Sequence, residues 1–261
     1  MDYLAYLITG IAAGLLAGLL GVGGGIVVVP ALSYLFHAQD FSPELIMHRA
    51  VGTSFAIMIF STAAAAFAFQ RRKLIIWPLF YKFVPGLIVG TAAASYFTQY
   101  LSDTNLRLAF AVFLFFMALY MFFSKEIKGN KPLPSFLILS IISILIGLLA
   151  GFFGIGGGSM MVPFFCYCQI EMHKSTATSV LCALPLAIVG TLGMSLSGWD
   201  AANIHHGLTG YVYWPAALIV ALSSLCFAPL GAKLASKISS RHLKRIFSIF
   251  LMVVAMDLFW S

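Results

Sequence analysis

Apolar stretches of roughly membrane-spanning length recur along this chain and limit what it can fold into. A helix needs about 20 apolar residues to cross the hydrocarbon core of a bilayer. The stretches that approach or exceed this length are 3–36, 50–69, 75–98, 106–123, 134–168, 175–196, 211–232 and 244–260. Hydrophobic residues make up 61% of the 261 residues and charged residues only 9%, which is too apolar for a soluble globule. Because a run such as 108–123 does not alternate as transmembrane strands do, the sequence predicts an all-α polytopic membrane protein embedded in a lipid bilayer.

The basic and sulfur-containing residues do not indicate a nucleic-acid or metal partner. The chain carries a formal net charge of +7, but its Lys and Arg residues lie in short loops between apolar stretches, where they act as topology signals. Cys166 and Cys168 form a CxC pair without a second pair to complete a metal site. We therefore expect free cysteines, no nucleic-acid partner, no metal site and no cofactor.

The chain is an internal duplication. Residues 14–30 read GLLAGLLGVGGGIVVVP and residues 147–163 read GLLAGFFGIGGGSMMVP. Further pairs follow in the same order: His48 with His173, Trp77-Pro78 with Trp214-Pro215, and 101–107 with 238–244. We therefore expect a first transmembrane repeat over 1–124, a polar linker with helix breakers over 125–134 and a second repeat over 135–261.

Each repeat has a glycine cluster inside an apolar stretch that is too long for one span. Each glycine destabilises a helix by about 1 kcal/mol, so the clusters should interrupt their helices, and Pro30 and Pro163 should add a second break or kink. Glycine-broken helices at matching places in two halves indicate a transporter site, where half-helix N-termini attract an anion. The predicted substrate-binding glycines are Gly21, Gly23, Gly24, Gly25, Gly154, Gly156, Gly157 and Gly158.

Close helix packing is the alternative role for glycines in such helices. The glycines to which we assign it, on their spacing, are Gly10, Gly14, Gly18, Gly147 and Gly151. For the triple glycines we favour binding-site backbone over packing alone. A nucleotide loop is excluded because the GxGxxG pattern fails at Ile26 and no Lys-Ser/Thr pair follows.

Hydroxyl groups near the breaks are further candidates for substrate binding. Thr53 and Ser54 match Thr178 and Ser179 of the second repeat. Their hydroxyls can donate to the oxygens of an anion, or can bond to carbonyls of their own helix. Ser159 follows its triple glycine directly and gives the second repeat a polar group that the first repeat lacks.

Three basic residues near the start of the Thr-Ser segments are candidates for proton transfer or for the entrance. His48 and His173 are either interfacial residues at the membrane edge or carry a proton with the substrate. Arg49 should lie outside the membrane as an exposed cation that attracts an anion.

Equivalent loops of the two repeats carry opposite charge patterns. The basic segment 71–73 corresponds to 198–206, which has no Lys or Arg, whereas 102–107 contains one Arg and the corresponding 233–245 contains five Lys or Arg residues. By the positive-inside rule equivalent loops face opposite sides, so the repeats should be inverted. Inversion needs an odd number of crossings, so each repeat should be a glycine-broken helical hairpin plus three transmembrane helices. If the long stretches are single spans instead, the repeats are not inverted.

The paired GxxGxGGG blocks, each ending in proline and followed by a Thr-Ser helix, resemble the sulfite exporter TauE/SafE family over essentially the whole chain. The resemblance implies a secondary transporter of a small anion, such as sulfite or an organosulfonate, and leaves the oligomeric state open. We expect it in a bacterial inner (plasma) membrane. The alternatives are a structural or assembly subunit, disfavoured by the matching breaks, and an intramembrane enzyme. The enzyme is disfavoured because the spans contain no acid pair and Ser54 lies six residues from His48 on one segment.

Overall fold

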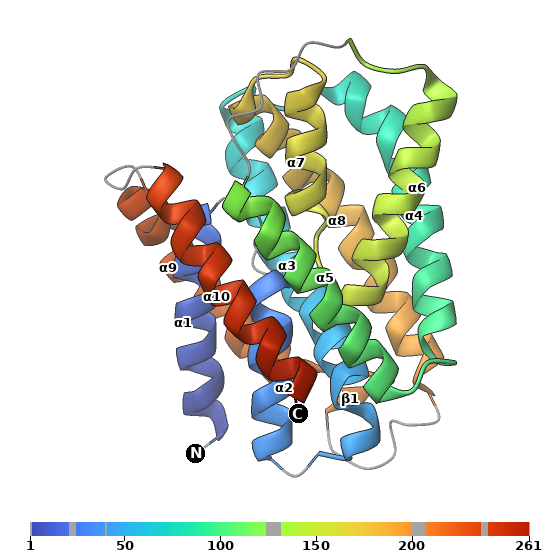
Figure 1. Cartoon of the computed structure of the whole chain (residues 1–261), viewed down its shortest axis with the longest axis vertical. Coiled ribbons are helices and arrows are strands. Elements are labelled where there is room, and N and C mark those ends of the chain that lie inside the picture. Colours follow the sequence, from blue (N-terminus) through green and yellow to red (C-terminus); the bar gives the residue numbers. More distant parts are fainter. Residues whose placement is uncertain are drawn as a thin grey trace.

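Helices make up almost all of the regular structure (Figure 1). The computed structural model describes residues 2–20, 25–39, 41–123, 132–199, 207–235 and 240–260. The first repeat contains α1 (Asp2–Leu20), α2 (Gly25–Ala38), a short 3-10 turn η1 (Pro43–Leu45), α3 (Ile46–Arg71), α4 (Trp77–Thr98) and α5 (Asp103–Phe123). The second repeat contains α6 (Phe136–Phe153), α7 (Gly158–Tyr167), α8 (Met172–Ser197), β1 (Leu208–Thr209), β2 (Val212–Tyr213), α9 (Trp214–Ala235) and α10 (Ser240–Trp260). Most of the predicted linker lies outside the described residues.

The prediction of an α-helical polytopic membrane protein is confirmed. Within the described residues, the helices long and apolar enough to cross a membrane are Pro43–Arg71, Asp103–Phe123, Phe136–Phe153, Met172–Ser197 and Trp214–Gly231. Large apolar side chains such as Phe116, Leu137 and Leu222 are more than half exposed on the outer surface. Such exposure suits a chain surrounded by lipid tails, which are as apolar as leucine.

The second long glycine-containing stretch is divided into two helices, as predicted, because α6 ends at Phe153 and α7 begins at Gly158. In the first stretch α1 ends at Leu20 and α2 begins at Gly25, and residues 21–24 lie outside the described part of the chain. In Figure 1, α7 runs back toward the end of the molecule at which α6 begins. Gly154 and Gly157 adopt left-handed backbone angles, with φ of 64° and 65°, which side chains other than hydrogen rarely allow.

The prolines do not break their helices, because Pro30 is the sixth residue of α2 and Pro163 is the sixth residue of α7. A proline inside a helix removes one intrahelical hydrogen bond. The kink that was the other expectation stays a prediction. A second difference is local: residues 211–213, expected in a span, belong to the antiparallel β1–β2 ribbon that precedes α9.

The first helix of each repeat packs against the Trp-Pro helix of the other repeat. Helix α1 contacts α9 and α6 contacts α4, while α3 contacts α8 and α5 contacts α10. The second half-helices lie on the helices that follow them, α2 on α3 and α7 on α8. Each of these contacts therefore has an equivalent between the matching elements of the other repeat.

Glycines make the exchanged helix pairs possible. A Cβ atom on Gly14 would lie 2.6 Å from the carbonyl oxygen of Ser224 in α9, and one on Gly147 would lie 2.5 Å from the carbonyl oxygen of Leu87 in α4. Real Cβ atoms do not approach backbone this closely. The packing role is confirmed for Gly10, Gly14, Gly147 and Gly151, whereas the surroundings of Gly18 lie outside the described part of the chain.

Alanine at either of these equivalent positions should destabilise the protein. We expect Gly14→Ala and Gly147→Ala each to lower the free energy of unfolding by about 1–3 kcal/mol, because the added methyl group forces two packed helices apart. Thermal unfolding of the purified protein in detergent measures the loss. Ala12→Val, on the exposed face of α1, is the control and should unfold at nearly the wild-type temperature. A destabilised Gly14→Ala beside an unchanged Gly147→Ala would contradict the equivalence of the two pairs.

Candidate functional site

The glycine break of the second repeat is in direct contact with the start of α2 in the first repeat. A Cβ atom on Gly25 would lie 2.8 Å from the carbonyl oxygen of Gly154 and 3.1 Å from the Cα atom of Ile155. A Cβ atom on Gly154 would lie 3.0 Å from the Cα atom of Val51 in α3. The predicted site glycines Gly25, Gly154, Gly156, Gly157 and Gly158 are all buried, whereas Gly21, Gly23 and Gly24 lie outside the described residues. The non-helical backbone of the second break is thus covered by protein rather than exposed to lipid.

Helix α7 begins at this break and carries a hydroxyl group without a partner. The N–H groups of Met160 and Met161 bond to the carbonyl oxygen of Gly157, at 3.0 and 2.8 Å. Gly157 provides no side chain to cap the helix. Ser159, in the first turn, is 5% exposed, and its Oγ makes no hydrogen bond to any described residue. A helix N-terminus with a buried free donor is an arrangement that binds anions.

The predicted Thr and Ser residues are buried at the contact between the repeats. Thr53 Oγ1 accepts a hydrogen bond from the backbone N–H of Tyr213 at 3.0 Å. Equivalently, Thr178 Oγ1 accepts one from the N–H of Ile76 at 3.1 Å. Each threonine therefore holds the residue that precedes the Trp-Pro pair of the other repeat.

The two serines donate to carbonyl groups in this conformation. Ser54 Oγ donates to the carbonyl oxygen of Gly154 at 2.8 Å and so links α3 to the break. Ser179 Oγ donates to the carbonyl oxygen of Thr176 in its own helix at 2.9 Å. Binding of an anion by these four residues stays a prediction.

His48 is buried and hydrogen-bonded, not interfacial. Its side chain is 2% exposed, with Nδ1 3.3 Å from Oδ1 of Asp103 and Nε2 3.1 Å from the carbonyl oxygen of Thr98. Both partners accept hydrogen bonds, so both ring nitrogens donate only when the imidazole is protonated. His173, its equivalent in sequence, is exposed in the first turn of α8, where an interfacial role fits.

The expectation that Arg49 is an exposed cation is wrong. Its side chain is fully buried in the first turns of α3, and its guanidinium carbon lies 5.2 Å from the centroid of the Phe41 ring. None of its three guanidinium nitrogens hydrogen-bonds to a described residue. Phe41 lies over the guanidinium, and the ring of Tyr211 lies 5.1 Å from that of His48 at the same end of α3.

Asp103 and Tyr211 are the residues near Arg49 that the sequence analysis missed. Asp103 accepts hydrogen bonds from His48 and from the backbone N–H of Met47, the latter at 2.7 Å. Burial raises the pKa of the Tyr211 phenol, and the nearby Arg49 only partly opposes this, so the phenol is neutral near pH 7. The sequence contained one signal for Asp103: the matching position of the second repeat is Ser240, so the carboxylate is not part of the duplicated pattern. No sequence pattern indicated a role for Tyr211.

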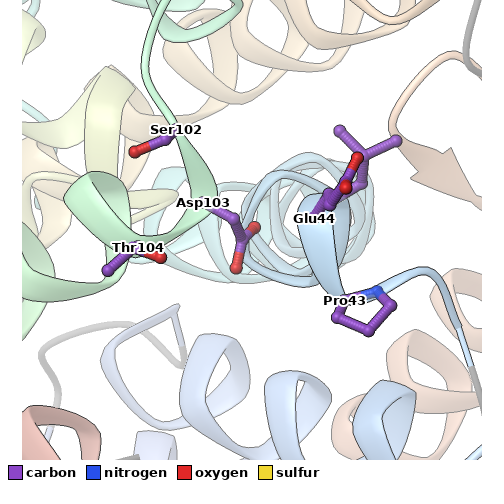
Figure 2. Close-up of a pocket in the computed structure, with 6 residues that line it drawn as sticks. Pro43, Glu44, Ser102, Asp103 and Thr104 are labelled. Atoms are coloured by element: carbon purple, nitrogen blue, oxygen red, sulfur yellow. The ribbon is translucent and has the colours of Figure 1, made fainter.

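A surface cavity of about 470 Å³ lies beside Asp103. It is lined by Pro43, Glu44, Leu45, Ser102, Asp103 and Thr104. In Figure 2 the carboxyl group of Asp103 points toward the turn that carries Glu44, whereas the side chains of Ser102 and Thr104 point to the other side. Asp103 therefore both lines the cavity and contacts the buried His48.

Comparison with known proteins matches this arrangement to a transporter family. The family model described as "Sulfite exporter TauE/SafE" matches residues 6–258. A probable membrane transporter protein of Haemophilus influenzae is 33% identical over 255 residues, which cover 97% of this chain and 96% of the relative. A probable membrane transporter protein of Methanocaldococcus jannaschii is 30% identical over 259 residues, which cover 96% and 92%. No solved structure matches the chain.

These matches extend over nearly the whole chain, including both glycine blocks and the helices packed on them. The names of the relatives indicate a membrane transporter rather than an enzyme. The helices of membrane-spanning length agree with an integral membrane protein. The chain belongs to the sulfite exporter TauE/SafE family.

Proposed function

We propose that the protein is a secondary transporter that moves a small anion of the sulfite or organosulfonate type across the membrane. Its substrate site includes the glycine break of the second repeat and the hydroxyl-bearing residues of α3, α7 and α8. The family name supports the sulfur-containing substrate, and the names of the relatives support transport.

The observation that carries this proposal is the free hydroxyl of Ser159 at the start of α7. A buried hydroxyl without a hydrogen bond destabilises the empty protein by about 1–3 kcal/mol, and an anion held at the helix N-terminus relieves that destabilisation. The partial positive charge of the helix end adds to the attraction. The left-handed glycines Gly154 and Gly157 let the chain turn sharply enough to present this end within the protein.

Removing this hydroxyl should weaken transport without unfolding the protein. We expect Ser159→Ala to raise the half-saturating anion concentration for flux roughly tenfold or more, because a hydrogen bond to a charged group contributes about 1.5–3 kcal/mol. Flux of labelled sulfite into proteoliposomes measures the effect. Ser224→Ala is the matched control, because Ser224 is equally buried but bonds to the carbonyl of Ala221 in its own helix. Equal flux in both variants would exclude Ser159 from the site.

We also propose that the two repeats are inverted relative to each other across the membrane. The exchanged contacts of α1 with α9 and of α6 with α4 support a two-fold relation between them. The equivalent hydrogen bonds of Thr53 and Thr178 support the same relation. The direction of the chain in Figure 1 favours inversion, because α1 begins at the lower end and α6 begins at the upper end. In this arrangement the movement of one repeat against the other opens the site to alternate sides.

Inversion predicts opposite sidedness for two equivalent loops. In a variant without the four native cysteines, Trp199→Cys should react with a membrane-impermeant thiol reagent on intact cells. Arg72→Cys should react only after permeabilisation. Both side chains are exposed, so access to the reagent depends on the membrane rather than on burial. Reaction of both cysteines from the same side would contradict inversion and leave the transport proposal standing.

A further inference from the structure

We propose that Arg49 is the positively charged group of an oxyanion-binding site at the N-terminal end of α3, apart from the glycine break. The inference rests on the proposed transport of an anion and adds the charge that binds it. The ligand it fits is a small anion with two or more oxygens on one side, such as sulfite, a sulfonate or a carboxylate. The planar guanidinium donates two parallel hydrogen bonds to such a group.

The first argument is the state of Arg49 itself. A guanidinium has five N–H donors and never loses its charge in a protein. Here the side chain is 0% exposed, and none of its nitrogens meets an acceptor among the described residues. The face of Phe41 attracts the cation but leaves the N–H groups around its edge unsatisfied. A buried guanidinium in this state needs acceptors for its N–H groups.

The second argument concerns the charges around the guanidinium. Asp103 acts on Arg49 electrostatically without a hydrogen bond, because its carboxylate is bonded to His48 and Met47. Tyr211 is neutral and supplies no negative charge. No described group therefore offers the guanidinium a hydrogen-bond acceptor, and the oxygens of an anion would supply it.

The third argument is the surface cavity near this site. Asp103 lines the surface cavity between η1 and the start of α5 (Figure 2), and it lies close enough to Arg49 to act on it electrostatically. Asp103 therefore lies between the cavity that it lines and the arginine on which it acts.

The second repeat has no equivalent of this site among its described residues. Lys174 occupies the matching position, but its side chain is 43% exposed and forms an ion pair with Glu171 at 3.0 Å. A solvated pair of this kind needs no further anion. The proposed site therefore occurs in the first repeat only, and Lys174 of the second repeat is the matched control for Arg49.

The test is anion-dependent thermal stabilisation of the purified protein in detergent, at constant ionic strength. Sulfite, methanesulfonate and acetate are compared with chloride. We expect the oxyanions to raise the unfolding temperature of the wild type. Arg49→Met should bind them about tenfold more weakly or worse, because it loses charge-assisted hydrogen bonds. Lys174→Met should respond as the wild type does. Without anion, Arg49→Met should unfold at or above the wild-type temperature, because an unbalanced buried charge has been replaced by an apolar side chain of similar size.

Two outcomes would overturn the inference. One is a wild-type anion response in Arg49→Met. The other is a fall in the anion-free unfolding temperature of that variant, which would mean that Arg49 is paired inside the protein. If Arg49→Met cannot be obtained folded, Arg49→Lys decides, since it keeps the charge but not the planar fork and should bind about tenfold more weakly. Anion flux in proteoliposomes is measured separately: normal flux in Arg49→Met refutes this site alone, whereas no flux in the wild type refutes the proposed function.

Discussion

The contact between the second glycine break and the first repeat is the constraint on which the rest of the structure depends. Hydrocarbon offers no hydrogen bonds to non-helical backbone, so a break at membrane depth has to be covered by protein. Gly25 and Val51 cover the second break directly, and Ser54 satisfies the carbonyl group of Gly154. Because Gly25 and Gly154 lack side chains, the two repeats approach until backbone touches backbone.

The exchanged packing of the helices follows from the same contact. In each repeat the two helices of the glycine-containing stretch pack on different helices. The first one packs on the other repeat, α1 on α9 and α6 on α4, and the second one packs within its own repeat, α2 on α3 and α7 on α8. Small residues line the contacts of α1 with α9 and of α6 with α4. They allow the helices to pack closely in lipid, where no hydrophobic driving force brings helices together. The threonines of α3 and α8 then hold the segments that lead into α4 and α9. Each repeat thereby completes the fold of the other.

The repeats share equivalent helix contacts but differ in their polar groups. At the start of α3 a histidine and an arginine are buried beside the partly exposed Asp103 of α5, whereas at the start of α8 the matching His173 is exposed and Lys174 is partly exposed. At the breaks it is the second repeat that carries the polar group, because Ser159 occupies the position that corresponds to Ile26 of the first repeat. A duplicated scaffold thus carries polar groups at two different places, and an anion crossing the protein meets a different chemistry in each repeat.

The sequence by itself determined the class of protein, the duplication and the position of the helix break in the second repeat. These depend on local properties: the length of apolar runs, the low helix stability of clustered glycines and the spacing of repeated motifs. It also identified the packing glycines of α1 and α6, because the GxxxG spacing acts along a single helix. A break at Pro30 and Pro163 did not form, because the helices α2 and α7 continue through both prolines.

Only the tertiary structure decided where the charges lie. Arg49 stands at the start of its helix, where a loop residue is usually exposed, and nothing local indicates that Phe41 lies over it. Asp103 and Tyr211 come from segments more than 50 and 160 residues away along the chain. Burial is a property of the assembled fold, since it depends on which distant segments pack over a side chain. The sequence therefore determined which residues carry charge, and the packing of the two repeats decided which of them are buried without a partner.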